Sequence, residues 1–310
     1  MRHFATLLPV GLSVGLMMTG CASGTDASDG SDSTADLSPT GMHSTSLGEV
    51  TPETQKIGEA RARTNQIQYH GGPVMSNGVN VYYIWYGTWS SAAQSILTTL
   101  AQGLGGSPYF NINTTYFSGS TTHTFVKNIV TYKSSTTDNY SLGKALSDAN
   151  IFTIVKNAIS AGKLPLDSNA VYFVLTASDV NETSGFCTQY CGWHTNGSVN
   201  GADVKYAFIG NPARCLSSCA AQTTSPNGDA GADGAASIVS HELEEATTDP
   251  DLNAWFDRTG EENADKCAWT FGTESTASNG SKFNVTLAGK QYLIQQNWVQ
   301  ATSGFCAMSH

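Results

Sequence analysis

The residues best suited to chemistry are His241, Glu242 and Glu245, which lie in the pentapeptide His-Glu-Leu-Glu-Glu at 241–245. This H-E-x-x-E pattern differs by one residue from the H-E-x-x-H pattern of zinc metallopeptidases. Side chains four positions apart share one face of an α-helix, so His241 and Glu245 could bind one cation. Glu242 would then act as the general base and take a proton from a water molecule. The pattern predicts a metal-dependent hydrolase resembling a peptidase.

The expected cofactor is Zn²⁺. Zinc accepts a carboxylate oxygen in place of an imidazole, and catalytic sites combine three protein ligands with one open position. Glu245 stands where a histidine would be, so a hard oxygen ligand replaces an imidazole nitrogen. Ca²⁺ or another divalent ion such as manganese or iron therefore competes better with zinc. The extra negative charge also makes a bound water less acidic, which favours lower activity.

Three downstream carboxylates are candidates for the third ligand. Asp251 lies ten residues after His241, and Asp265 lies twenty residues after Glu245; both offsets occur among metallopeptidases. Glu262 is a further candidate. If no metal binds, the stripe that carries His241 and Glu245 is a solvent-exposed polar face of the helix.

Other sites are less well supported by the sequence. Residues 249–253 begin like an EF-hand loop, but Ala254 and Gly260 occupy the positions that need glycine and glutamate. A less regular calcium site at Asp229, Asp233 or Asp249 stays open. His70 and His194 are predicted to be structural histidines, and the chain has no G-x-S-x-G motif for a serine nucleophile.

Around the motif, apolar patterning predicts alternating strands and helices. The motif helix is expected to end before Pro250, because proline disfavours a helical residue before it. The expected strands are 79–86, 124–132, 170–176, 205–210, 283–287 and 292–298, and the expected helices are 90–102, 150–161 and 233–248. This order predicts an α+β layered domain. The order also resembles that of zincin-like peptidase domains, and this resemblance implies a mixed sheet whose edge-type strand at 205–210 precedes the motif helix.

The N-terminal segment resembles an export signal. Residues 1–20 combine Arg2 with an apolar run at 7–18, and Met18-Thr19-Gly20-Cys21 resembles a lipobox in which Cys21 is lipidated. The alternative is an ordinary secretory signal with an incidental cysteine. Residues 21–64 are rich in serine, aspartate and glycine and are predicted to form a disordered tether. We expect an exported protein, either secreted or anchored to the cell envelope (the outer membrane or the cell surface) through lipid on Cys21.

Residues 65–310 are long enough for one large domain. The formal net charge of −10 disfavours nucleic acid as a partner. The expected partner is a peptide for the hydrolase, or a cell-wall polymer for a non-catalytic domain. The six cysteines after Cys21 form an even set, which in an exported chain predicts three disulfides of open connectivity. A four-cysteine zinc knot is the alternative. The six are Cys187, Cys191, Cys215, Cys219, Cys267 and Cys306.

Several ordered motifs resemble the phosphate-induced protein 1, or exordium-like, family. They are residues 69–74 (Y-H-G-G-P-V), 79–87, 187–194 (C-x3-C-G-W-H), 210–212 with 215–219 (G-N-P and C-x3-C), and 226–234 (P-N-G-D-A-G-A-D-G). The resemblance implies an extracellular, disulfide-bonded domain. It does not imply an activity, because none is established for the plant members.

The H-E-x-x-E segment divides this family. The chain is similar to bacterial members in which the motif is followed by E-x-x-D-x-C, here residues 262–267. The resemblance therefore favours Glu262 and Asp265 over Asp251 as the third ligand. The competing hypothesis is a non-catalytic domain that binds wall polymer or a surface partner, any metal being structural, with tryptophans as a sugar platform. Those tryptophans are Trp85, Trp89, Trp193, Trp255 and Trp298.

Overall fold

The computed structural model describes the backbone of residues 43–46 and all of residues 66–310. The predicted signal at 1–20, the lipidation site Cys21 and most of the tether at 21–64 lie outside the described residues. Among the described residues, no helix is long and apolar enough to cross a membrane.

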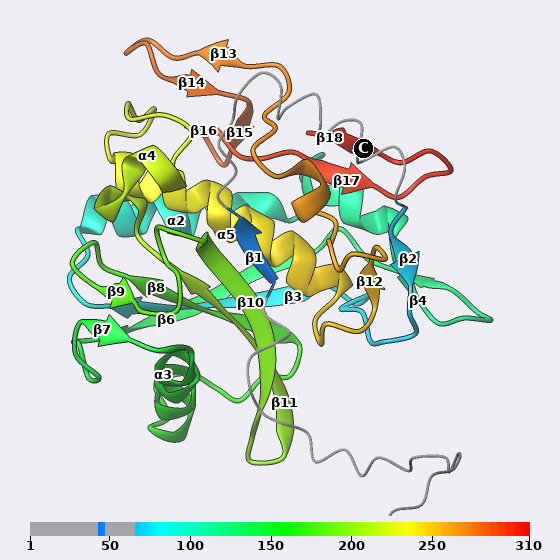
Figure 1. Cartoon of the computed structure of the whole chain (residues 1–310), viewed down its shortest axis with the longest axis horizontal. Coiled ribbons are helices and arrows are strands. Elements are labelled where there is room, and N and C mark those ends of the chain that lie inside the picture. The colour runs from blue at the N-terminus through cyan, green and yellow to red at the C-terminus, as the bar shows by residue number, and fades with distance from the viewer. Residues whose placement is uncertain (1–42, 47–65) are drawn as a thin grey trace, which may run out of the picture. The chain divides into compact units, whose positions relative to one another are not determined.

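A six-stranded mixed sheet forms the centre of the fold, in the order β1-β10-β11-β8-β3-β6 (Figure 1). The neighbouring pairs β11 and β8, β8 and β3, and β3 and β6 run parallel. Strand β10 runs antiparallel to β11, and β1 runs antiparallel to β10. Strand β10 is therefore antiparallel to both of its neighbours, whereas β11, β8, β3 and β6 run parallel to one another.

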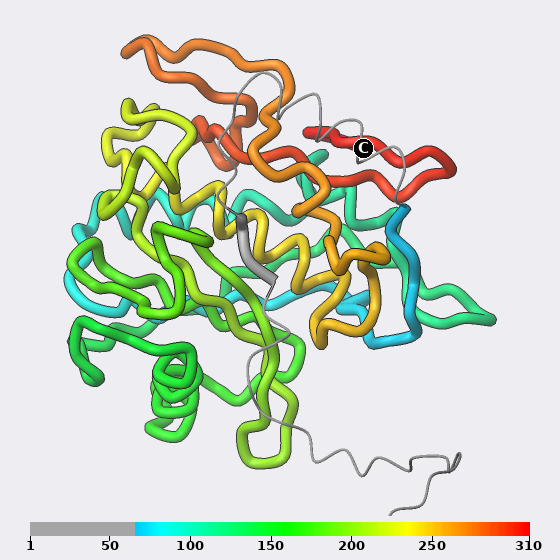
Figure 2. The backbone as a smooth tube through the Cα atoms, in the orientation of Figure 1, coloured from blue at the N-terminus to red at the C-terminus, as the bar shows by residue number. Residues whose placement is uncertain are grey.

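The bounds of the elements follow the chain order, and Figure 2 traces the same path from one end to the other. The strands are β1 His43–Ser46, β2 Gln68–Tyr69, β3 Val79–Tyr86, β4 Phe117–Ser118, β5 Thr124–Phe125, β6 Val130–Asp138, β7 Ala145–Leu146, β8 Ala170–Thr176, β9 Asn181–Glu182, β10 Tyr190–Val199, β11 Ala202–Ile209, β12 Trp255–Phe256, β13 Ser275–Thr276, β14 Lys282–Phe283, β15 Val285–Leu287, β16 Lys290–Tyr292, β17 Asn297–Val299 and β18 Phe305–Ala307. The helices are α2 Ser91–Leu104, α3 Asp148–Ser160, α4 Leu216–Cys219 and α5 Ala230–Thr248, with 3-10 turns η1 Phe110–Thr115, η2 Pro212–Arg214 and η3 Asp265–Cys267.

The parallel strands at the centre are apolar along their whole length. All seven residues of β8 are buried, and so are seven of the eight residues of β3. Strands covered by helices on both faces need such continuous runs rather than an alternating pattern. This explains why the β-branched and aromatic runs at 79–86 and 170–176 identify these strands from sequence alone.

Helices cover both faces of the sheet (Figure 1). Helices α2 and α5 pack together on one face, while α3 packs against β8 and β11 on the other. Segments from the C-terminal part of the chain contact α2 and α5 on their outer side. Helix α5 therefore lies between the sheet and these segments, and this position buries it almost completely.

The prediction of an α+β domain is confirmed, and the main departures concern strands. The single strand expected at 124–132 is two elements, β5 and β6. The strand before the motif helix, β11, was expected at an edge but is paired on both sides, by β10 and β8. Strand β10 was not predicted, because its outer half, Thr-Asn-Gly-Ser, lacks the apolar character of a strand.

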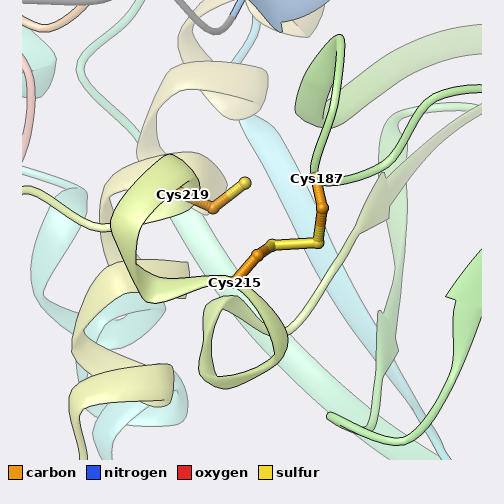
Figure 3. A group of neighbouring side chains, drawn as sticks. All are labelled: Cys187, Cys215 and Cys219. Carbon is orange, nitrogen blue, oxygen red and sulfur yellow. A yellow bond between two sulfur atoms is a disulfide. The ribbon is translucent and has the colours of Figure 1, made fainter.

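The six cysteines form three disulfides, as predicted for an exported chain. The pairs are Cys187–Cys215, Cys191–Cys219 and Cys267–Cys306. Figure 3 shows the Cys187–Cys215 bond with Cys219 beside it. Sulfurs of Cys187, Cys215 and Cys219 lie close enough to hold a metal, but the disulfides occupy all three, which excludes the predicted alternative of a zinc knot. The third bond ties η3 to β18 near the end of the chain.

Candidate functional site

Helix α5 carries the H-E-x-x-E motif through the middle of the domain. Asp229 caps its first turn by accepting a hydrogen bond from the backbone N–H of Ala232 at 2.9 Å. The helix ends at Thr248, two residues before Pro250, as predicted. His241, Glu242 and Glu245 are at most 1% exposed. The motif therefore does not lie on a solvent-exposed polar face, which was the alternative to a metal site.

The structure brings His241 and Glu245 together with Asp265, one of the three predicted third ligands. The Nε2 atom of His241 lies 2.9 Å from Oε1 of Glu245 and 3.4 Å from Oδ1 of Asp265. The backbone N–H of Asp265 also donates to Oε1 of Glu245 at 3.0 Å. Ligand atoms from all three residues lie within 4.8 Å of one another. The twenty-residue offset thus places Asp265 beside the helix, at the start of η3.

Glu262, another predicted ligand, lies on the opposite side of Glu245, beside His194. Its Oε2 atom is 3.1 Å from Nε2 of His194, and both side chains are fully buried. The same Nε2 atom is 3.8 Å from Oε2 of Glu245. His194, Glu242 and Glu245 form a second group whose ligand atoms lie within 4.8 Å of one another. His194 therefore belongs to the cluster, although its sequence context predicted a structural histidine.

Strand β10 reaches the helix closely because of Gly192, two residues before His194. A Cβ atom at Gly192 would lie 2.6 Å from Cγ2 of Ile238 and 3.3 Å from Oε1 of Glu242. Any side chain there would push the strand away from α5. The disulfide between Cys191 and Cys219 holds the preceding residue of the strand to α4. These features position His194 and Glu242 against each other.

The cluster contains more negative charge than its own cations balance. Burial raises the pKa of Glu262 well above its ordinary value, and the carboxylates of Glu245 and Asp265 raise it further. Burial alone would lower the pKa of His241, but Glu245 and Asp265 hold a proton on its ring and raise that pKa well above its usual range. The crowding of carboxylates thus favours the protonated forms of both Glu262 and His241.

This donor set fits a divalent cation. It consists of imidazole nitrogens and carboxylate oxygens, which suit zinc and also harder ions such as manganese. The spacing of His241 and Glu245, 2.9 Å between the facing atoms, allows both to contact one ion. A divalent ion would offset the negative charge that Glu242, Glu245 and Glu262 bring into the buried site.

Asp251, the remaining predicted ligand, lies outside the cluster. Its Oδ1 atom is 3.4 Å from Nζ of Lys205, and its side chain is 20% exposed. The loop after α5 carries it away from the helix, so the ten-residue offset does not bring it to His241. Asp251 is paired with a lysine instead of facing the motif.

The carboxylates considered for a calcium site serve the ends of α5. Asp229 caps the start of the helix, and Asp233 accepts hydrogen bonds from Asn227 in the preceding loop. Asp249, at the other end of the 19-residue helix, accepts from the backbone N–H groups of Asn253 and Ala254, each at 2.6 Å. Asp229 and Asp249 are separated by the length of the helix, about 28 Å, so they cannot share an ion.

His70 and the tryptophans have structural positions. The ring of His70 stacks on Phe256 with 3.8 Å between ring centroids, and His70 belongs to neither group of ligand atoms around the motif. Of the five tryptophans considered as a sugar platform, only Trp89 is partly exposed. The other four, Trp85, Trp193, Trp255 and Trp298, are at most 3% exposed.

A second buried network was not predicted from the sequence. Glu244 is fully buried beside the motif, and Asn297 in β17 donates a hydrogen bond to its carboxylate. Asn263 donates to the backbone carbonyl of Glu244 at 3.2 Å and to Asn113 at 3.1 Å. This network ties the helix to η1 and to the C-terminal segment. The helix neighbours of Glu244 three and four positions away are Ser240, His241, Thr247 and Thr248, so the sequence places it on a polar face and does not signal its burial.

Comparisons with known proteins agree with the family resemblance. The family model described as "Phosphate-induced protein 1 conserved region" matches residues 67–308. The chain is 31% identical to Protein EXORDIUM-like 3 of Arabidopsis thaliana over 289 residues, covering 81% of this chain and 86% of that protein. It is 28% identical to Protein PHOSPHATE-INDUCED 1 of Nicotiana tabacum, covering 61% and 67% of the two chains. No solved structure matches the chain. Because this family model spans nearly the whole described domain, the chain belongs to the phosphate-induced protein 1 (exordium-like) family.

Proposed function

We propose that this protein is an exported metal-dependent hydrolase of the peptidase type. The observation that carries the proposal is the buried group of His241, Glu245 and Asp265, whose ligand atoms lie within 4.8 Å of one another. Glu242 follows His241 directly on the same helix and is fully buried. This combination supplies three ligands and a general base from one helix and one turn.

The bound cation would polarise a substrate carbonyl and make a nearby water more acidic. Glu242 would accept the proton of that water as its oxygen forms a bond to the carbonyl carbon. Glu242 would then return the proton to the nitrogen as the carbon–nitrogen bond breaks. The close approach of β10 at Gly192 would limit the movement of this carboxylate during both transfers.

The edge of the sheet supports a peptide as the substrate. Strand β1, a segment of the chain itself, pairs antiparallel with β10, and His43 lies opposite His194. An extended peptide that adds to a sheet edge gains backbone hydrogen bonds along its length. A peptide that takes the place of β1 on β10 would pass directly beside the cluster. The mixed sheet with an antiparallel edge pair and a buried motif helix also supports a zincin-like architecture.

The three disulfides support export to an oxidising compartment. We propose that the chain is anchored to the cell envelope through lipid on Cys21. Mass spectrometry of the mature N-terminus would detect the lipid, and Cys21→Ser should release the protein into the medium. An unmodified Cys21 in the mature protein would contradict the anchor.

The test of the hydrolase combines metal analysis with turnover of a broad peptide library. The wild type should bind metal and cleave peptides, whereas Glu242→Gln should keep the metal and lose cleavage. His241→Ala should lose both, and the matched control Asp251→Asn should lose neither, because Asp251 faces Lys205. A metal-free wild type would refute the proposal. Metal bound by the wild type with no cleavage of any peptide would assign the metal a structural role.

A further inference from the structure

The two oxygens of the Glu245 carboxylate face two different histidines. Oε1 lies 2.9 Å from Nε2 of His241, which is one turn earlier on α5. Oε2 lies 3.8 Å from Nε2 of His194, which comes from β10. The helix and the strand therefore approach the same carboxylate from two sides. A carboxylate in this position can bind two cations, one through each oxygen.

Each histidine also has a second carboxylate of its own. Asp265 lies 3.4 Å from the ring nitrogen of His241, and Glu262 lies 3.1 Å from that of His194. Glu262 and Asp265 are connected directly, because the backbone N–H of Glu262 donates to Oδ2 of Asp265 at 3.2 Å. The result is two sets of one imidazole and one carboxylate, with Glu245 common to both.

The charge of the cluster also points to more than one cation. Four carboxylates converge on the two imidazoles: Glu242, Glu245, Glu262 and Asp265. Three of them are fully buried, and the side chain of Asp265 is 14% exposed. With both histidines neutral, one divalent ion would leave two negative charges in a buried site, and uncompensated buried charge is costly. Two divalent ions would balance all four carboxylates.

We propose that the cluster is a two-cation site with Glu245 as the bridging ligand. The first cation takes His241 and Asp265, and the second takes His194 and Glu262. Paired metal ions of this kind recur in hydrolases, where they act on both sides of the reacting centre. This inference rests on the proposed function for the first cation, and the second cation is new. Glu242 lies within ligand distance of His194 and Glu245, so it stays beside the second cation.

Metal stoichiometry tests the proposal without measuring activity. The full chain is stripped with a chelator, equilibrated with Zn²⁺ and analysed by elemental mass spectrometry. The wild type should hold two zinc ions per chain, and His194→Ala and Asp265→Asn should each hold one. Glu245→Gln should hold fewer than either single variant, because both ions lose a ligand. His70→Ala is the matched histidine control and should hold two.

A second measurement separates loss of an ion from loss of the fold. When Mn²⁺ replaces Zn²⁺, electron paramagnetic resonance of the wild type should show magnetically coupled ions. Glu262→Gln, which keeps a side chain of the same size, should show only the signal of isolated Mn²⁺. One zinc ion per chain in the wild type would overturn the second cation and leave the proposed function intact. A chain that binds neither zinc nor manganese would instead refute the proposed function, and two ions that survive in Glu245→Gln would overturn the bridge.

Discussion

Removal of the metal should lower the melting temperature of the domain by an amount that depends on the metal concentration relative to its dissociation constant. A ligand that binds only the folded state at 100 times its dissociation constant contributes about 2.7 kcal/mol. For a domain the size of residues 66–310, each kcal/mol shifts the melting temperature by about 2–4 °C. One zinc ion should therefore raise the melting temperature by about 5–11 °C. Two ions at the same saturation should raise it by about twice as much.

The assay is differential scanning calorimetry of the chelator-treated chain at a series of zinc concentrations. The melting temperature should rise with the logarithm of zinc concentration above the dissociation constant. His241→Ala should abolish most of the rise, because it removes a buried ligand, whereas His70→Ala should keep it, because His70 stacks on Phe256 away from the cluster. A rise of equal size in His241→Ala would refute the assignment of the metal to this cluster. So would a wild type whose melting temperature does not respond to any divalent ion.

Three further predictions concern the structure around the cluster. Lys266→Met leaves the buried Asp257 without the ammonium group that lies 2.7 Å away, and should lower the free energy of unfolding in urea by about 3–5 kcal/mol. The same change at Lys144, whose ion pair is exposed, should leave stability unchanged within error. Burial raises the pKa of Glu244 well above its ordinary value, so the free energy of unfolding falls as the pH rises above that ordinary value. Glu244→Gln should therefore have the same melting temperature as the wild type at about pH 4 and a higher melting temperature at neutral pH. A difference in melting temperature that stays constant with pH would contradict this. Gly192→Ala places a methyl group against α5 and should cost about 1–3 kcal/mol while weakening zinc binding; an unchanged zinc affinity would show that β10 does not position the site.

Much of the fold could be predicted because its signals are local. The runs at 79–86 and 170–176 identify the central strands, and the helix expected at 90–102 corresponds to α2, Ser91–Leu104. The cysteines predicted three disulfides from their number and from the export signal. Their connectivity could not be predicted, because it depends on how β10 and α4 meet in three dimensions.

The candidate site was only partly predictable. Helical spacing brought His241 and Glu245 together, and the offset to Asp265 identified the residue that the structure places beside them. His194 could not be assigned, because its strand carries polar residues and glycine, and because it meets α5 only through long-range packing. Asp251 shows the limit of an offset argument, since the loop after Pro250 turns its carboxylate toward Lys205.

Anomalous X-ray diffraction from crystals of the zinc-loaded protein tests the central claim most directly. The account predicts a zinc peak bounded by His241, Glu245 and Asp265, with a second peak between His194 and Glu262. Peaks confined to surface residues, with the cluster empty at saturating zinc, would contradict the account.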